Sequence, residues 1–91
     1  MNIQDLINDK KTTILDVRTE EEFVSGNVDG SINIPLDKVV DRAEELKQMQ
    51  PLVVCCLSGG RSGQAAAYLQ SLGCNEVYNG GGWQMVDAQK K

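Results

Sequence analysis

The stretch that decides the fold runs from Leu52 to Ser62 and reads LVVCCLSGGRS. Its first half, Leu52–Cys56, is a continuous apolar run, which is typical of a strand buried on both faces of a sheet. Two glycines follow in a short loop, and a helix is expected to begin at Arg61. In open α/β sheets, ligands bind beyond the carboxyl ends of the strands. The stretch therefore predicts both a buried parallel strand and the position of a site.

Patterns typical of strands and of helices alternate on both sides of this stretch. We expect further strands at 12–17, 30–35 and 76–78, and helices at 2–9, 19–25, 37–48, 61–72 and 83–89. A capping box of Thr19 and Glu22 supports the second helix, and Asn79–Gly82 is expected to be a turn. The helix at 37–48 is expected to bury one apolar face made of Val39, Val40, Ala43 and Leu46. The alternation predicts an α/β fold, a small and mainly parallel sheet with helices on both faces.

Composition narrows the class of protein. The 91 residues, 41% of them hydrophobic, fit one folded domain over 1–91. The net charge of −4 and the lack of a basic stripe argue against nucleic acid as a partner, and no stretch is long enough for a membrane span. Three cysteines without any histidine or CxxC motif predict reduced thiols and neither metal nor cofactor. This usage fits a cytoplasmic protein, or a periplasmic one if an export signal has been removed.

Cys56 stands where the central strand meets the loop, and its thiol is the candidate nucleophile. Gly59 and Gly60 allow the loop to aim several backbone N–H groups inward, and the following helix adds the positive end of its dipole. Arg61 is the one cation in the sequence between Leu52 and Val86. Because such groups lower the pKa of a thiol, we expect a Cys56 thiolate near neutral pH in a chain that has no histidine base.

The other two cysteines are expected to fill the core. Cys55 precedes Cys56 on the strand, so its side chain points to the opposite face of the sheet. Cys74 follows Gly73, the glycine that ends the helix, where a small apolar residue fits the core.

The segment Cys56–Ser62 resembles the CxxGxRS active loop of rhodanese-like sulfurtransferase domains. Three further segments, in the right order, are similar to the family's LDVR…EE(F/Y), GHIxGAxNIP and V-Y-N…GG motifs: Leu15–Phe23, Gly26–Pro35 and Val77–Gly82. Asn27 stands where the family usually has a histidine, a position that tends to be structural. The resemblance covers nearly the whole chain and implies the rhodanese fold.

The resemblance also implies a reaction in two half-reactions. The Cys56 thiolate takes the outer sulfur of thiosulfate, a persulfide or a protein sulfur donor, and cyanide or a thiol then removes it from the Cys56 persulfide. The expected substrate-binding residues are Leu57, Ser58, Gly59, Gly60, Arg61 and Ser62. Arg61 is expected to draw an anionic donor and stabilise the thiolate, and Ser62 to form hydrogen bonds at the helix start. Asp16 and Arg18 either brace the loop as a hydrogen-bonded pair or act directly.

Alternative functions stay open at this point. A sulfur-carrier or partner-binding module would show little activity with thiosulfate, and the presence of Cys56 argues only against an inactive module. A Cys-dependent phosphatase uses a Cys-x5-Arg loop, whereas four residues separate Cys56 from Arg61. Counting from Cys55 gives five, but that side chain would face away from the loop. A nucleotide-binding P-loop is rejected because the loop lacks a Gly-Lys-Ser/Thr ending.

Overall fold

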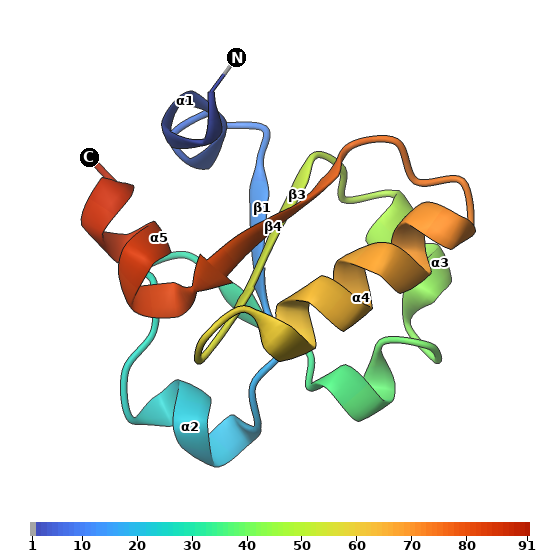
Figure 1. Ribbon diagram of the computed structural model, residues 1–91, viewed down its shortest axis with the longest axis horizontal. Coiled ribbons are helices and arrows are strands. Elements are labelled where there is room, and N and C mark those ends of the chain that lie inside the picture. The colour runs from blue at the N-terminus through green and yellow to red at the C-terminus, as the bar shows by residue number, and fades with distance from the viewer. Residues whose placement is uncertain (1) are drawn as a thin grey trace.

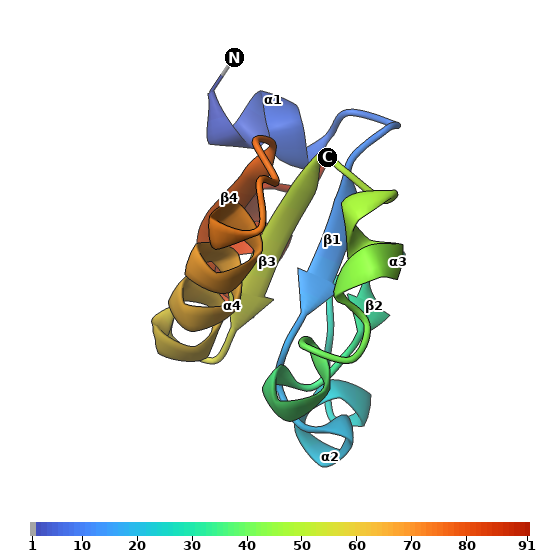
Figure 2. The same ribbon diagram turned by 90° about the vertical axis from the view of Figure 1, so that its right-hand side faces the viewer.

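A four-stranded parallel sheet organises the fold (Figure 1), and its strands lie in the order β2-β1-β3-β4 (Figure 2). The computed structural model describes residues 2–91. The strands are β1 (Thr13–Asp16), β2 (Ile32–Asn33), β3 (Leu52–Cys56) and β4 (Val77–Gly82). All five residues of β3 are buried between its two neighbours, as the apolar run predicts. The α/β class and the parallel sheet are therefore confirmed.

Helices lie on both sides of the sheet in Figure 1, and Figure 2 shows the helices of one face in front of the strands, which confirms the second part of the fold prediction. They are α1 (Ile3–Ile7), α2 (Glu20–Val24), α3 (Ala43–Lys47), α4 (Gly60–Ser71), α5 (Trp83–Gln89) and a short 3-10 helix, η1 (Leu36–Lys38). One core cluster joins the sheet to α3 and α4, and a second joins it to α1 and α5. Helix α2 lies beyond the carboxyl end of β1, on the edge where the site is expected (Figure 1).

The segment 37–48 is not a single helix, contrary to the expectation. It divides into η1 and α3, and Val40, expected in the core, is 60% exposed. The segment begins with hydrogen bonds between residues three apart in sequence, such as the bond from the Lys38 N–H to the Pro35 carbonyl at 2.8 Å. Adjacent β-branched residues such as Val39 and Val40 are weak helix formers, so the first turn stays tight and only Val39 is buried with α3.

Strand β4 continues through Asn79–Gly82, where the glycines predicted a turn. Cys55 and Cys56 of β3 pair with Gly81 and Gly82, and a register shift leaves Gly80 as the extra residue. A Cβ on Gly80 would lie 2.7 Å from a methyl group of Val53, so glycine is required for this close approach. Pairing with β3 therefore overrides the local turn tendency and brings the glycines beside Cys56.

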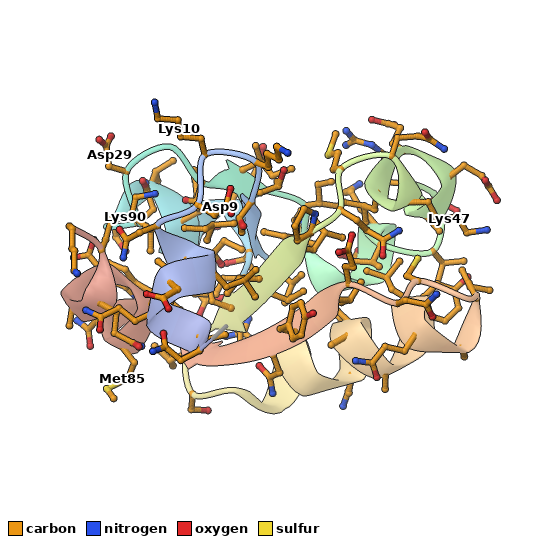
Figure 3. All side chains as sticks on the ribbon, turned by 90° about the horizontal axis from the view of Figure 1, so that it is seen from above. Asp9, Lys10, Asp29, Lys47, Met85 and Lys90 are labelled. Atoms are coloured by element: carbon orange, nitrogen blue, oxygen red, sulfur yellow. The ribbon has the colours of Figure 1, made fainter. Side chains whose placement is uncertain are left out.

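The charged side chains of Lys10, Asp29, Lys47 and Lys90 lie at the periphery of the molecule in the view from above (Figure 3). In the part of the chain that the structure describes, no helix combines the length and the apolar character needed to span a bilayer.

Candidate active site

Cys55 and Cys56 point to opposite faces of the sheet, as strand alternation predicts. Cys55 belongs to the core cluster under α1 and α5, and Cys56 to the cluster under α3 and α4. Burial, reinforced by the charge of Asp16, raises the pKa of the Cys55 thiol to about 12. Cys55 is therefore a protonated core residue, and Cys74 is buried in the core as well.

The Cys56 sulfur accepts a hydrogen bond from the loop and shares another with the first turn of α4, in which either atom can donate. The Gly59 N–H lies 3.0 Å from Sγ, and the Ser62 hydroxyl lies 3.3 Å from it. Burial raises the pKa of this thiol, but the Ser62 hydroxyl and the backbone N–H groups of Ser62, Gly59 and Ser58 outweigh it. The pKa of Cys56 therefore lies below that of an ordinary thiol, although the residue is only 1% exposed.

Glycines set the shape of the loop around the thiol. Gly59, the N-cap of α4, has φ +105°, a left-handed conformation that side-chain-bearing residues rarely adopt. Gly82 of β4 lies under the loop, where a Cβ would be 2.8 Å from the Leu57 carbonyl oxygen. The loop is thus held against β4 by backbone contacts that leave no room for side chains.

Ser62 is not simply a helix-start residue, because its hydroxyl joins the thiol to Asn79. It donates a hydrogen bond to Asn79 Oδ1 at 2.7 Å, and that oxygen also accepts from the Gly81 N–H at 3.0 Å. Asn79 Nδ2 donates to the Gly59 carbonyl at 3.2 Å. The two backbone partners fix the orientation of the amide, so Asn79 ties β4 to both ends of the loop. Sequence reasoning missed this role, although Asn79 belongs to the V-Y-N…GG segment.

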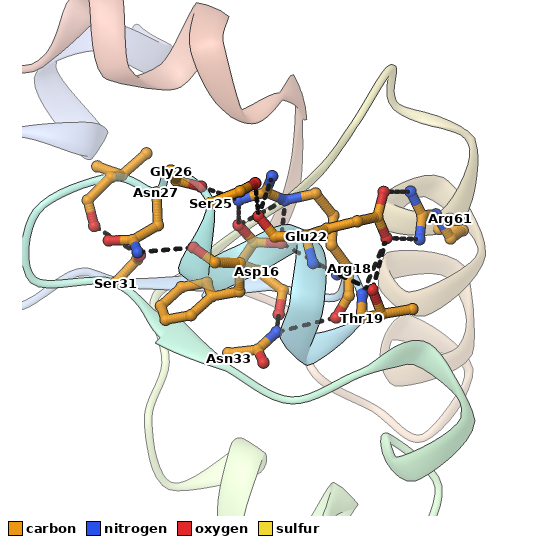
Figure 4. A network of polar contacts seen from close by, with 12 residues as sticks. Asp16, Arg18, Thr19, Glu22, Ser25, Gly26, Asn27, Ser31, Asn33 and Arg61 are labelled. Carbon is orange, nitrogen blue, oxygen red and sulfur yellow. Dashed lines mark hydrogen bonds and ion pairs between the residues drawn. The ribbon is translucent and has the colours of Figure 1, made fainter.

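Arg61, which is expected to draw an anionic donor, has a carboxylate beside its guanidinium. Its guanidinium is paired with Glu22 of α2, Nη1 to Oε1 at 2.7 Å and Nη2 to Oε2 at 2.9 Å (Figure 4). Glu22 also accepts from the Thr19 N–H, which confirms the predicted capping box. The bonds from Arg61 and Thr19 lower the pKa of Glu22 to about 2, so the carboxylate stays charged beside Arg61. Sequence reasoning did not find Glu22 as a partner of the loop, because 39 residues separate the two.

Asp16 and Arg18 form a buried ion pair at 2.7 Å that braces the neighbouring segment (Figure 4). Arg18 also donates to the carbonyl groups of Glu22 and Gly26, and its guanidinium lies 4.7 Å from the centre of the Trp83 ring. These contacts tie β1, α2 and α5 together. They favour the bracing role over a direct one.

The remaining predicted binding residues follow Cys56 in the loop and at the start of α4. Leu57, Ser58 and Gly60 are exposed, and the Leu57 side chain, 61% exposed, is an apolar group next to Cys56. Their contact with a substrate stays a prediction. Asn27, in the position of the family's histidine, donates to the Phe23 carbonyl at 2.8 Å and is exposed.

Comparisons of this chain with known proteins all point to one protein family. The family model described as Rhodanese-like domain matches residues 2–88. The uncharacterized protein YqhL of Bacillus subtilis is 39% identical over 77% of this chain, and YrkF of the same species, a proposed sulfur carrier protein, is 37% identical over 84%. This chain spans only 56% and 41% of the lengths of those two relatives.

In two further matches, the aligned region covers a larger share of the matched protein. The thiosulfate sulfurtransferase PspE of Escherichia coli is 40% identical over 84% of this chain and 75% of its own length. The solved structure of a rhodanese with anions from Escherichia coli superimposes with a TM-score of 0.70 at 34% identity, over 81% of this chain and 89% of that one.

Proposed function

The chain belongs to the rhodanese-like domain family, and from this premise we propose that it is a sulfurtransferase whose nucleophile is Cys56. The observation that carries the proposal is the cradle around Sγ: the Gly59 N–H at 3.0 Å and the Ser62 hydroxyl at 3.3 Å, at the start of a 12-residue helix. Such a cradle favours an anion on sulfur without a histidine base.

The reaction follows from what the cradle can hold. The Cys56 thiolate attacks the outer sulfur of a donor such as thiosulfate or a persulfide, and the bond between the two donor sulfurs breaks with its electron pair on the leaving group. The resulting Cys56 persulfide is again an anion that the N–H groups of Ser58, Gly59 and Ser62 can stabilise. A thiol or cyanide then attacks the outer sulfur and releases the thiolate, which predicts ping-pong kinetics.

A sulfur carrier with little thiosulfate activity is the second candidate. The pairing of Arg61 with Glu22 favours it, because no other cation of the loop and the elements that follow it, Leu52–Val86, can attract a dianion. The similarity to YrkF supports the same interpretation. A carrier accepts sulfur from a persulfide donor much faster than from thiosulfate.

A phosphatase is disfavoured by the position of the thiols. The Cys-x5-Arg spacing would require Cys55 as nucleophile, but Cys55 is fully buried on the opposite face of the sheet. Hydrolysis of p-nitrophenyl phosphate by the wild type, absent in Cys56→Ser, would restore this candidate.

Intact-protein mass spectrometry tests the proposal. After treatment with thiosulfate or with cysteine persulfide, the wild type should gain the mass of one sulfur atom and lose it on addition of cyanide. Cys56→Ser should gain nothing, while Cys55→Ser and Cys74→Ser, which replace buried thiols outside the cradle, should still be loaded. Full loading of Cys56→Ser would refute the assignment.

A further inference from the structure

Both arginines of the site region have their charges neutralised by a carboxylate. Arg61 is held by both oxygens of Glu22, and Arg18 is held by Asp16 at 2.7 Å inside the core. Arg61 is the only cation of Leu52–Val86, the part of the chain that contains the loop and β4. The region around Cys56 is therefore rich in hydrogen-bond donors but close to neutral in charge.

The surface next to Arg61 also lacks an excess of positive charge. A shallow hollow beside the loop is lined by Val17, Thr19, Pro35, Leu36, Asp37 and Arg61. Three of these six residues, Val17, Pro35 and Leu36, are apolar, and the exposed carboxylate of Asp37 adds a negative charge. Helix α2 carries two more exposed carboxylates, Glu20 and Glu21, next to Glu22. The adjoining hollow, which shares Thr19, Pro35 and Asp37, also carries Lys38 and Arg42, and Arg42 is paired with Glu45. A donor that approaches over the hollow beside Arg61 meets apolar groups and the carboxylate of Asp37.

We propose that Glu22 is a specificity-determining residue that neutralises Arg61 and so selects thiol persulfides over thiosulfate as sulfur donors. The inference rests on the proposed sulfur transfer at Cys56 and names the donor class. Thiosulfate is a dianion and leaves as sulfite, also a dianion, whereas a persulfide carries at most one charge on its sulfurs and leaves as a thiolate. The step conserves charge in both cases, but only thiosulfate needs two negative charges to approach the anionic Cys56.

The charge of Glu22 can be removed without removing its structural role. Gln at the third position of α2 still closes a capping box with Thr19, and its amide oxygen still accepts from the Arg61 guanidinium. Glu22→Gln therefore releases the positive charge of Arg61 and keeps one of the two hydrogen bonds, because the amide nitrogen that replaces one carboxylate oxygen cannot accept. Glu21→Gln is the matched control, because it removes the same charge from the same helix at an exposed position.

The experiment measures kcat/KM for formation of the Cys56 persulfide with two probes, thiosulfate and cysteine persulfide, at low ionic strength. Coulomb attraction between a dianion and one unpaired charge near the surface predicts that Glu22→Gln raises the thiosulfate-to-persulfide ratio by about five- to tenfold. Glu21→Gln should change it by less than about twofold, since its charge is farther from the donor and screened by water. An unchanged ratio in Glu22→Gln, or an equal rise in Glu21→Gln, would overturn the inference.

A second measurement needs no variant and guards against a Glu22→Gln protein that does not fold. In the wild type, the rate of loading from thiosulfate should stay level or rise as NaCl is added, because a neutral site in a negatively charged protein offers no attraction to screen. A steep fall with salt would show an attractive site and would also overturn the inference. If neither probe loads the wild type, the proposed function itself fails; loading with an unchanged ratio refutes only the role of Glu22.

Discussion

Replacing Ser62 by alanine should raise the pKa of the Cys56 thiol. The Ser62 hydroxyl lies 3.3 Å from Sγ and 2.7 Å from Asn79 Oδ1, and it has one proton for the two acceptors. While Cys56 is a thiol, the proton bonds Asn79 and the S–H group can donate to Ser62. When the thiolate forms, the hydroxyl turns toward sulfur, and Asn79 keeps its bond from the Gly81 N–H at 3.0 Å.

The magnitude follows from this exchange of partners. A hydrogen bond to a charged group contributes about 1.5–3 kcal/mol, and the neutral bond given up at Asn79 contributes about 1 kcal/mol. The net gain of about 0.5–2 kcal/mol corresponds to a pKa change of roughly one unit, at 1.36 kcal/mol per unit. In Ser62→Ala, the thiolate fraction below the pKa of Cys56 should therefore fall about tenfold.

The assay is the rate of iodoacetamide labelling of Cys56 as a function of pH, since only the thiolate reacts. The midpoint should move upward in Ser62→Ala and stay in place in Ser71→Ala. Ser71 is a matched control, because it lies at the other end of α4 and its hydroxyl bonds only the Tyr68 carbonyl. A downward shift in Ser62→Ala would refute the reasoning, because it would mean that Ser62 keeps its proton on Asn79 and acts on Cys56 only as an acceptor.

Three other predictions concern the framework of the site. Gly82→Ala should lower the free energy of unfolding in urea by about 1–3 kcal/mol, because its Cβ would lie 2.8 Å from a loop carbonyl oxygen, whereas Gly60→Ala, whose Cβ meets no atom within 4 Å, should not. Asp16→Ala should cost about 3 kcal/mol or more in the same assay, because it leaves the Arg18 guanidinium buried without its carboxylate; a loss below about 1 kcal/mol would contradict this. Since the pKa of Glu22 is lowered from 4.5 to about 2, its contribution to stability should be complete above about pH 4.5 and be lost as the pH falls toward 2; equal acid sensitivity of Glu22→Gln would contradict this.

The parts of the fold that were predictable from sequence are those in which local pattern and tertiary packing agree. The apolar run of β3 and the capping box of α2 are such cases, and both elements form where expected. The helix predicted at 37–48 failed because the periodicity placed Val40 in the core, whereas short-range hydrogen bonds after Pro35 turn it outward. The turn predicted at Asn79–Gly82 failed because glycine marks both turns and places where two backbones must lie close together.

The candidate site likewise contains residues that the sequence predicts and residues that only the fold reveals. Cys56 and the loop that follows it are contiguous in sequence, so one segment was enough to find them. Asn79 and Glu22 reach the loop from elements 17 and 39 residues away from their partners. Only the arrangement of β4 and α2 at the carboxyl edge of the sheet brings them to the loop, and no local pattern contains that information.

The pKa values of Cys55 and Cys56 differ because the two neighbouring residues of β3 face opposite sides of the sheet. Cys55 and Cys56 share a strand and are both almost fully buried, and burial raises the pKa of each. Cys55 faces apolar groups and the negative charge of Asp16, so its pKa reaches about 12. Cys56 faces N–H and hydroxyl donors that no change of pH near neutrality can remove, so its pKa falls. The reactivity that we propose for Cys56 would therefore come from the donors on its side of the sheet, and burial would be an advantage there because it strengthens each hydrogen bond to the thiolate.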